Sequence, residues 1–329
     1  VRPPALKTLG TGATGFGGRH LVDRLLGAGG EVTALVRSPE KAAGLAERGV
    51  RLVQGDLHDT GALAEAVRGQ DVVHHVAALV GAVDEAEFLR ANREGTANVV
   101  AAVLDAAPGA RFVLTSSLAA AGPAVPGVPR RADVPEAPVT MYGRSKRAAE
   151  RVVRESGLDW VIARPPAVYG PRDRDNFIAV FKAARWGLCP VFGDGSQELS
   201  MVYAPDLAEA LYLAGTTPGI AGRTYFVNHP EIVTSATVVQ EIARAAGRSV
   251  RLVPIPRGAA EFALGIAGGT ASLLKRKTIL RADKAHEFYQ PAWTGDTGPF
   301  LRDTGWQPAH ALRPGLEATY RWYVERGWL

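Results

Sequence analysis

The sequence predicts an α/β fold in which a doubly wound parallel sheet is followed by a smaller α/β lobe. A short apolar segment, a glycine-rich turn and an amphipathic segment follow one another near the N-terminus. Strand-like and helix-like segments then alternate through about residue 165, a pattern typical of a parallel sheet covered by helices. We expect residues 1–170 to form the first domain, with 200–228 returning to it, and residues 171–199 and 229–329 to build mainly the second lobe.

The N-terminal turn, Thr11–Gly18, has the pattern of a loop that holds the pyrophosphate of a dinucleotide. The apolar run Leu6–Leu9 predicts a strand before it, and His20–Leu26 predicts a helix after it, which is the context that this pattern requires. The sequence therefore predicts a Rossmann-type first domain. The residues of the turn that we expect to contact the cofactor are Gly12, Thr14, Gly15, Phe16 and Gly18.

Each glycine of the turn has a separate task. The first permits the tight turn, the second lets the backbone approach the pyrophosphate, and the third lets the helix pack close to the strand. The free N–H groups at the start of the helix would face the phosphates. The spacing G-x-x-G-x-x-G is one residue longer than G-x-G-x-x-G, and an ordinary glycine-rich turn is the alternative.

The second predicted strand, Glu31–Arg37, bears on which dinucleotide is bound. An NAD site usually ends this strand with an acid that hydrogen-bonds the ribose 2′-hydroxyl, but here the strand ends in Val36 and Arg37 follows. The guanidinium of Arg37 could bind a 2′-phosphate through two hydrogen bonds. We therefore favour NADP(H) over NAD(H), and the alternative is a solvated arginine at the start of the next turn.

The third and fourth predicted strands end in residues suited to the rest of the cofactor. Asp56 and Leu57 follow the strand Val50–Gln54. Asp56 could reach the adenine amino group, or it could cap the helix predicted for Thr60–Val67. The fourth strand starts at Asp71 and runs into small residues that would lie against the cofactor, namely Val76, Ala77 and Ala78.

A serine, a tyrosine and a lysine form the predicted catalytic set. The fifth predicted strand ends at Ser117, and open α/β sheets bind their ligands at the carboxyl ends of strands. Tyr142 and Lys146 are four residues apart, so they share one face of a helix. A free tyrosine titrates near pH ~10, and the lysine would favour the phenolate for acid–base work. The alternative is an exposed Tyr and Lys on a surface helix.

These residues resemble the extended short-chain dehydrogenase/reductase family, which is the NAD-dependent epimerase/dehydratase family. The matching motifs span nearly the whole chain: TGATGFGG (11–18), GDL (55–57), HVAA (75–78), TSS (115–117), YGRSK (142–146) and RPPAVYGP (164–171). By this resemblance Ser117, Tyr142 and Lys146 are the catalytic triad. The resemblance also implies that Asn92 bends a helix and holds a water behind the lysine. It further implies that Pro165 and Val168 belong to the loop beside the nicotinamide.

Two departures from the family pattern bear on the substrate. Nucleotide-sugar members carry an arginine for the diphosphate where this chain has Glu198-Leu199-Ser200, and a buried diphosphate without a partner is costly. The missing acid at Val36 argues against NAD. Residues 270–308 look like the branch that holds hydroxysteroid dehydrogenases and dihydroflavonol reductases, which act on hydrophobic alcohols and ketones.

These observations predict an NAD(P)-dependent oxidoreductase that transfers a hydride between the nicotinamide and a hydrophobic alcohol or ketone. One alternative is a nucleotide-sugar epimerase or dehydratase with tightly bound NAD. The other is a non-catalytic, dinucleotide-sensing regulator, although such proteins typically lose the Tyr–Lys pair that this chain keeps.

Composition adds expectations about partners and compartment. The 329 residues include a single cysteine, Cys189, which excludes intrachain disulfides and fits a reducing cytoplasm. We expect no metal site, because His74 and His75 are adjacent and would point to opposite faces of a strand. The net charge of +5 is scattered, so no nucleic-acid partner is expected. The apolar stretch 259–274 is too short and interrupted to be a firm membrane anchor. A monomer or homodimer is expected.

Overall fold

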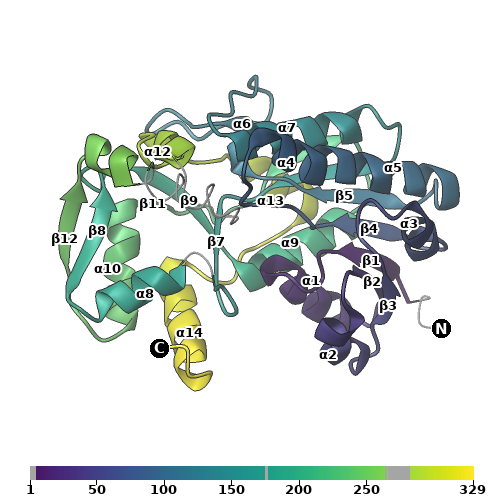
Figure 1. Cartoon of the computed structure of the whole chain (residues 1–329), viewed down its shortest axis with the longest axis horizontal. Coiled ribbons are helices and arrows are strands. Elements are labelled where there is room, and N and C mark those ends of the chain that lie inside the picture. The colour runs from purple at the N-terminus through teal and green to yellow at the C-terminus, as the bar shows by residue number, and fades with distance from the viewer. Residues whose placement is uncertain (1–4, 175–176, 264, 266–281) are drawn as a thin grey trace.

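A seven-stranded parallel sheet forms the centre of the molecule, in the order β10-β6-β5-β4-β1-β2-β3 (Figure 1). The structure is a computed structural model that describes residues 5–174, 177–263, 265 and 282–329. The strands are β1 (Lys7–Thr11), β2 (Glu31–Val36), β3 (Arg51–Gln54), β4 (Val72–His75), β5 (Arg111–Thr115), β6 (Trp160–Arg164) and β10 (Arg223–Phe226). The strand order reverses between β1 and β4, and folds of this kind bind ligands at the carboxyl ends of the strands beside such a reversal.

Helices cover both faces of this sheet, so the predicted Rossmann-type α/β fold is confirmed (Figure 1). One face carries α1 (Phe16–Gly27) and α9 (Ala204–Thr216), whose apolar sides share one buried cluster. The opposite face carries α3 (Thr60–Val67), α5 (Gly95–Ala106) and α7 (Met141–Arg154). Shorter elements connect them: η1 (Pro39–Ala42), α2 (Ala43–Ala46), α4 (Glu85–Phe88), the π-helical turn η2 (Leu89–Glu94) and α6 (Leu118–Ala121).

Helix α7 has clear reasons to form where it does. Thr140 caps its first turn by accepting a hydrogen bond of 3.1 Å from the N–H of Gly143. Arg151 and Arg154 in its last turn complement the negative end of the helix dipole. Its buried residues recur at helical spacing, and they include Ser145, Lys146, Ala149, Glu150 and Val153. The catalytic candidates therefore lie on a helix that is fixed against the sheet.

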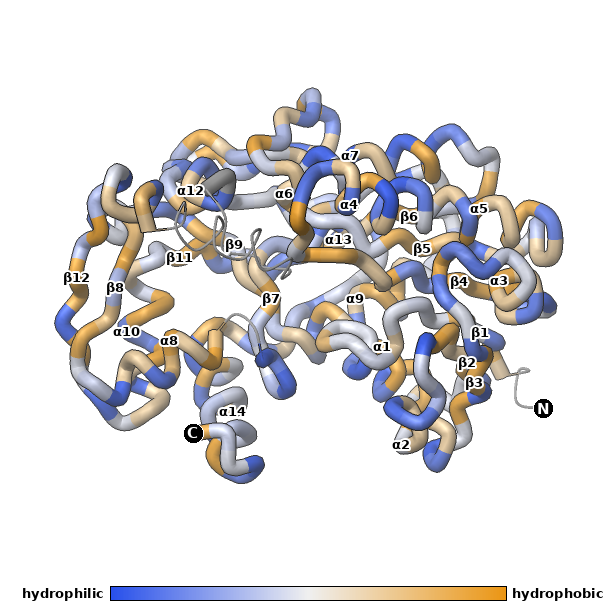
Figure 2. Tube along the Cα trace, in the orientation of Figure 1, coloured by the Kyte–Doolittle hydropathy of each residue, from blue (hydrophilic) through white to orange (hydrophobic). Residues whose placement is uncertain are grey.

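The smaller lobe is built around a second sheet. That sheet contains β11 (Ile232–Thr234), β9 (Glu198–Tyr203), β13 (Ala292–Trp293) and β7 (Ala167–Tyr169), which pairs with β9. A two-stranded ribbon pairs β8 (Leu188–Phe192) with β12 (Arg251–Ile255). The helices of this lobe are α8 (Phe177–Ala184), α10 (Ser235–Ala245), α12 (Ala282–Phe288) and α14 (Leu312–Glu325). Their apolar side chains form one buried cluster, and hydrophobic stretches recur along β8, α8 and α10 (Figure 2).

Three segments lie elsewhere than the predicted division of the chain places them. Strand β7 lies within the predicted first domain, 1–170, but pairs with β9 in the smaller sheet. Strand β9 belongs to the smaller sheet, so only α9 and β10 of the segment 200–228 return to the first domain. Helix α13 (Gly298–Thr304) and Trp306 pack into the same cluster as α1 and α9, because Phe300 and Trp306 bury their rings there. The C-terminal part of the chain therefore packs against both the first domain and the smaller lobe.

The segment 259–274 lies partly outside the described residues, since residues 264 and 266–281 are not among them. Within the described residues, every helix is too short or too polar to cross a lipid bilayer.

Candidate active site

The glycine-rich turn passes close to the end of β4. Gly12 has a φ of +75°, and a Cβ atom on it would lie 2.8 Å from the backbone nitrogen of Ala77. A Cβ atom on Gly18 would overlap the carbonyl of Gly12, so the start of α1 lies directly against the turn. Thr14 and Gly15 are exposed there. The turn and the end of β4 thus form a backbone cradle that faces the N-terminus of α1.

A buried chain of hydrogen bonds supports this cradle. The side-chain oxygen of Thr11 lies 2.8 Å from Nδ1 of His75, and Nε2 of His75 lies 3.0 Å from the hydroxyl of Thr96. The N–H of Ala77 donates to the hydroxyl of Thr11 over 3.3 Å. Burial, and secondly the charge of Lys146, lower the pKa of His75 to about 3, so its ring is neutral at neutral pH. The histidine is therefore a structural link between β1, β4 and α5.

His74 occupies the opposite face of β4. It is buried, and a Cβ atom on Gly215 of α9 would lie 3.0 Å from its ring. Burial lowers the pKa of His74 to about 4. Among the described residues, no group of His, Cys, Asp and Glu side chains is arranged to hold a metal ion.

The end of β2 places a cation at the edge of the sheet where the dinucleotide is expected to bind. Val36 is buried and ends the strand, and the side chain of Arg37 is exposed immediately after it. The next residues form η1, which brings the exposed Lys41 to the same region of the molecule. An anionic 2′-phosphate at this strand end would therefore meet no carboxylate from β2.

A basic pocket lies beside this strand end, between α1 and the η1–α2 segment. It is lined by Arg19, Lys41, Ala42, Gly44, Leu45, Arg48 and Arg172. Asp23 accepts hydrogen bonds of 2.6 Å from both Arg48 and Arg172, so it balances part of the charge. The sequence pattern did not indicate this pocket, because its cations come from three separate segments of the chain.

Asp56 and Leu57 lie at the end of β3 near the same edge. Asp56 is exposed and accepts a 2.7 Å hydrogen bond from the N–H of His58. The alternative that Asp56 caps α3 is wrong, because Asp59 holds the N-cap position and its carboxylate accepts from the first turn. The carbonyl of Leu57 accepts a 2.8 Å hydrogen bond from Asn98 of α5. The carboxylate of Asp56 therefore does not cap α3.

The predicted catalytic residues come together at the carboxyl end of β5. Ser117 follows this strand after Ser116 and caps α6. Tyr142 lies in the first turn of α7, near enough to Ser117 for the serine hydroxyl to lower the pKa of the phenol. Its ring packs against Phe88 with a centroid distance of 6.0 Å. One helical turn further, the ammonium of Lys146 donates to the carbonyl of Thr115 over 2.8 Å.

Burial sets the protonation states of Tyr142 and Lys146. It raises the pKa of Tyr142 to about 12. The hydroxyl of Ser117 lowers this pKa in part, and the charge of Glu287 in α12 raises it further. Burial also lowers the pKa of Lys146 to about 8, against the attraction of Glu150. At neutral pH the phenol is therefore protonated and the amine is largely charged, so Tyr142 is prepared to give a proton.

Asn92 links the end of β4 to the catalytic helix. It is buried in the π-helical turn η2, where the helix departs from α geometry. Its side chain accepts from the N–H of Leu79 over 2.7 Å and donates to the carbonyl of Leu79 over 3.0 Å. It also donates to the hydroxyl of Ser145 over 2.9 Å, directly beside Lys146.

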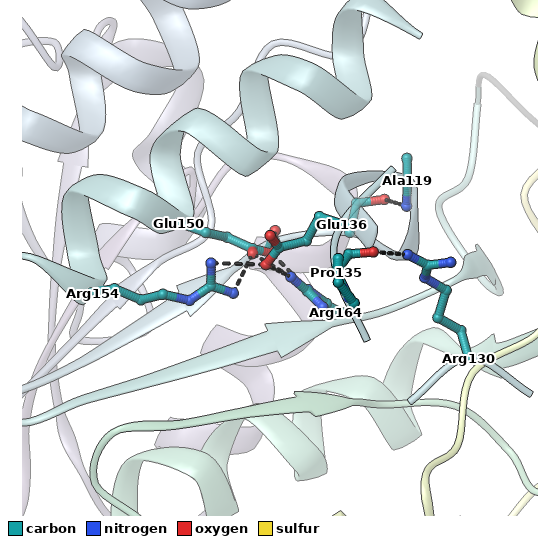
Figure 3. Close-up of polar contacts among 9 residues, drawn as sticks. Ala119, Arg130, Pro135, Glu136, Glu150, Arg154 and Arg164 are labelled. Carbon is teal, nitrogen blue, oxygen red and sulfur yellow. Dashed lines mark hydrogen bonds and ion pairs between the residues drawn. The ribbon is translucent and has the colours of Figure 1, made fainter. Parts of the chain in front are cut away.

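A buried ion network stands behind the triad (Figure 3). Arg164, at the end of β6, donates to both oxygens of Glu150 over 2.9 and 2.6 Å and to Glu136 over 2.9 Å. Ser116 also donates to Glu150. Arg154 pairs with Glu136 at 2.9 Å and with Glu150 at 2.8 Å. The network fastens α7, β5 and β6 to the loop 122–138, which carries Glu136.

This network was not predicted from the sequence, although the spacing of Lys146 and Glu150 could have indicated part of it. Glu150 is four residues after Lys146 on the same buried face of α7. Arg164 is the first residue of the motif RPPAVYGP (164–171), whose Pro165 and Val168 are predicted to belong to the loop beside the nicotinamide. That loop is held by a 2.8 Å hydrogen bond from the N–H of Leu118 to the carbonyl of Pro165. Val168 lies in β7, which pairs with β9 of the smaller lobe.

The sequence profile of the NAD dependent epimerase/dehydratase family matches residues 9–227, which is more than half of the chain. The protein belongs to this family. The fold, the cradle and the motifs of the catalytic helix agree with that assignment, and the predicted resemblance is confirmed.

Proteins similar to this chain include two reductases. A ceramide reductase from Caulobacter vibrioides (strain NA1000 / CB15N) is 32% identical over 319 residues, covering 97% of this chain and 95% of the relative. A 2-alkyl-3-oxoalkanoate reductase from Shewanella oneidensis is 30% identical over 285 residues, covering 81% and 73%.

A solved structure of MoeE5 in complex with UDP-glucose and NAD is also similar. It has a TM-score of 0.78 and 25% identity, and the alignment covers 98% of this chain and 100% of MoeE5. The family member described here thus resembles both reductases and proteins that bind nucleotide sugars.

Proposed function

We propose that this protein is an NADP(H)-dependent reductase of a hydrophobic ketone, with Ser117, Tyr142 and Lys146 as its catalytic residues. The observation that carries the proposal is the convergence of these three residues at the carboxyl end of β5, with Tyr142 beside Ser117 and protonated at neutral pH. The similarity to a ceramide reductase and a 2-alkyl-3-oxoalkanoate reductase supports the substrate class.

The residues at the sheet edge fit a dinucleotide. Any side chain on Gly12 would fill the cradle, since its Cβ atom would already lie 2.8 Å from the backbone of Ala77. The exposed Thr14 and Gly15 would hold the pyrophosphate against the N-terminus of α1. Asp56 and Leu57 would contact the adenine, and Val76 and Ala78 would line the path of the cofactor. Phe16, Pro165 and Val168 complete the proposed set.

Arg37 would bind the 2′-phosphate, which is the basis for preferring NADP(H). Its side chain is exposed at the end of β2, and no carboxylate ends that strand. The exposed Lys41 and the neighbouring basic pocket add positive charge to this end of the site. A charge-assisted pair of this kind discriminates against the uncharged 2′-hydroxyl of NADH.

The bound cofactor would supply the hydride. Tyr142 would donate its proton to the carbonyl oxygen of the substrate, and Ser117 would orient that oxygen through its hydroxyl. The charge of Lys146 would stabilise the phenolate that remains and would also hold the ribose. Asn92 would act as a positioning residue, because its hydrogen bond to Ser145 fixes the turn of α7 that carries Lys146.

In the described structure, the three positions of β9 that match the diphosphate-binding arginine of nucleotide-sugar members, Glu198-Leu199-Ser200, carry no cation. Within the described part of β9, Glu198 accepts a 2.8 Å hydrogen bond from the N–H of Gly127. Leu199 packs with the apolar cluster of the lobe, and Ser200 is buried. An unpaired diphosphate against these residues would be costly, and a hydrophobic substrate would not be.

A substrate screen tests this proposal. NADPH and NADH oxidation should be followed with aromatic, cyclic and long-chain aliphatic ketones, and binding of UDP-, GDP- and dTDP-sugars should be measured by calorimetry. We expect turnover of an apolar ketone with a higher kcat/KM for NADPH, and no saturable binding of the sugars. A micromolar dissociation constant for any nucleotide sugar would contradict the substrate class.

The similarity to MoeE5 favours a second candidate, a nucleotide-sugar epimerase or dehydratase. Such an enzyme regenerates its cofactor within each turnover and keeps it bound. The purified protein would then carry NAD that resists removal by gel filtration, whereas the proposed reductase should exchange its cofactor freely.

A further inference from the structure

The β8–β12 ribbon forms the outermost edge of the smaller lobe, far from the central sheet (Figure 1). Its two strands are parallel, and paired residues share a face. Cys189 and Val191 point inward and are buried in the apolar cluster of the lobe. Helices α8 and α10 pack on that inner side. On the outer face, Phe192 at the end of β8 stacks on Phe288 of α12 at a centroid distance of 4.4 Å, while Leu188, Pro190 and Val253 stay exposed.

The outer face is apolar at its centre. Leu188 is 55% exposed, and Val253, which pairs with the exposed Pro190, is 43% exposed. Trp186 lies two residues before β8 and is 85% exposed, which is the largest exposure of any large hydrophobic side chain among the described residues. A single exposed hydrophobic residue is ordinary, but a tryptophan beside a continuous apolar strand face is not.

Basic residues surround these apolar side chains. They come from the segments 182–188 (KAARWGL) and 244–251 (RAAGRSVR), neither of which contains an acidic residue. The two segments meet where the N–H of Arg251 donates to the carbonyl of Gly187 over 2.9 Å. We call the whole set the Trp186 surface; its exposed members are Lys182, Arg185, Trp186, Leu188, Pro190, Arg248, Arg251 and Val253.

The cations of this surface are not ion-paired. Among the described residues, Lys182, Arg185, Arg248 and Arg251 take part in none of the ion pairs, and Glu241 of α10 pairs instead with Arg244 and Arg313. Elsewhere exposed arginines commonly do form such pairs, as Arg313 does with Glu241 at 2.9 Å. The Trp186 surface therefore presents unpaired positive charge together with an exposed indole and aliphatic side chains.

We propose that the Trp186 surface docks the protein on an anionic lipid bilayer. Tryptophan prefers the level of the lipid headgroups, because its ring is apolar and its N–H is polar. Lysine and arginine around it would contact the phosphates, and each basic residue near an anionic bilayer strengthens binding. The inference does not depend on the substrate class proposed above.

Co-sedimentation with vesicles tests the proposal on the full-length protein. Vesicles of phosphatidylcholine with about a third phosphatidylglycerol should sediment the protein, and vesicles of phosphatidylcholine alone should not. Added NaCl should release it, because salt screens the attraction between exposed charges. Each neutralised cation should lower the partition coefficient about fivefold, so the triple variant Arg185→Gln/Arg248→Gln/Arg251→Gln should lose nearly all binding.

Matched variants separate the surface from general charge and hydrophobicity. Trp186→Ser should weaken binding, whereas Leu104→Ser, at an exposed leucine of α5, should not. Arg68→Gln, at an exposed arginine that follows α3, controls for total charge. Brominated lipids should quench the tryptophan fluorescence of the wild type more than that of Trp186→Phe, because the indole would lie within the bilayer interface.

Three outcomes would overturn the proposal. One is absence of sedimentation with the anionic vesicles. The second is equal sedimentation of the wild type and the Arg185/Arg248/Arg251 variant. The third is a dimer that Trp186→Ser dissociates without vesicles, because the surface would then join two copies of this chain.

Discussion

Glu150 and Arg164 form a fully buried ion pair joined by two hydrogen bonds of 2.6 and 2.9 Å. Replacing Glu150 with Gln keeps the shape but leaves the guanidinium with too little negative charge. Breaking a buried pair on one side costs about 3–5 kcal/mol. We expect Glu150→Gln to lower the free energy of unfolding by about this amount in urea titrations.

A control for this substitution is available on the same helix. Glu155 at the end of α7 is exposed, so Glu155→Gln makes the same chemical change outside the network. It should change the free energy of unfolding by less than about 0.5 kcal/mol. A cost for Glu150→Gln as small as that of Glu155→Gln would show that the network adds little to stability.

Tyr142→Phe tests the proton donor. The ring and its contact with Phe88 remain, but the hydroxyl is lost. Turnover should fall by at least about 10²–10⁴-fold, which is the usual contribution of general acid–base catalysis. Cofactor affinity should stay near normal in a fluorescence titration. Tyr320→Phe, on α14, should leave turnover unchanged. If Tyr142→Phe keeps more than about a tenth of the rate, another group is the acid.

The pH dependence of ketone reduction tests Lys146. Its pKa is lowered to about 8 by burial, so the ammonium is present below pH 8 and is lost as the pH rises through that value. The reduction rate should therefore be level near pH 7 and fall above about pH 8. Lys146→Arg keeps the charge to far higher pH and should remove this fall, even at a lower maximal rate. The same alkaline fall in Lys146→Arg would assign it to a different group.

Arg37→Ala tests the choice of cofactor. Loss of a charge-assisted hydrogen bond should weaken NADPH binding by about 1.5–3 kcal/mol and leave NADH binding nearly unchanged. Isothermal calorimetry with both cofactors measures this, and Arg68→Ala controls for the loss of one positive charge. An equal loss for both cofactors, or an initial preference for NADH, would rule out a 2′-phosphate contact.

Much of the fold follows from local patterns. The glycine turn, the alternation of apolar strands with helices and the Tyr–Lys spacing are contiguous signals. They predicted five strands at the sequence positions of β1 to β5 and the helices between them. The place of β9 could not be predicted in this way, because an apolar strand of six residues can join either sheet. Its pairing with β7 and β11 depends on contacts that arise only after both have folded.

In the candidate site, too, local spacing predicted some features, and others depend on contacts between distant segments. Sequence spacing was enough to place Tyr142 and Lys146 on one face of α7. It did not indicate that Glu136 and Glu150 would share Arg164, because a buried ion network joins residues from distant segments. The capping of α3 shows a smaller limit: Asp56 and Asp59 both precede that helix, and only the backbone geometry decides that Asp59 is the cap.

The π-helical turn at Leu89–Glu94 contains more residues per turn than an α-helix would. Deleting a single residue there would let the turn relax to α geometry. The segment before it would keep nearly its present orientation relative to α5, because the wide turn already accommodates the extra residue. The deletion should therefore spare the contact of Phe88 with the ring of Tyr142 but remove the local backbone that holds Asn92 against Leu79 and Ser145. One inserted residue thus brings an amide beside the helix that carries Lys146 without disturbing the helices on either side.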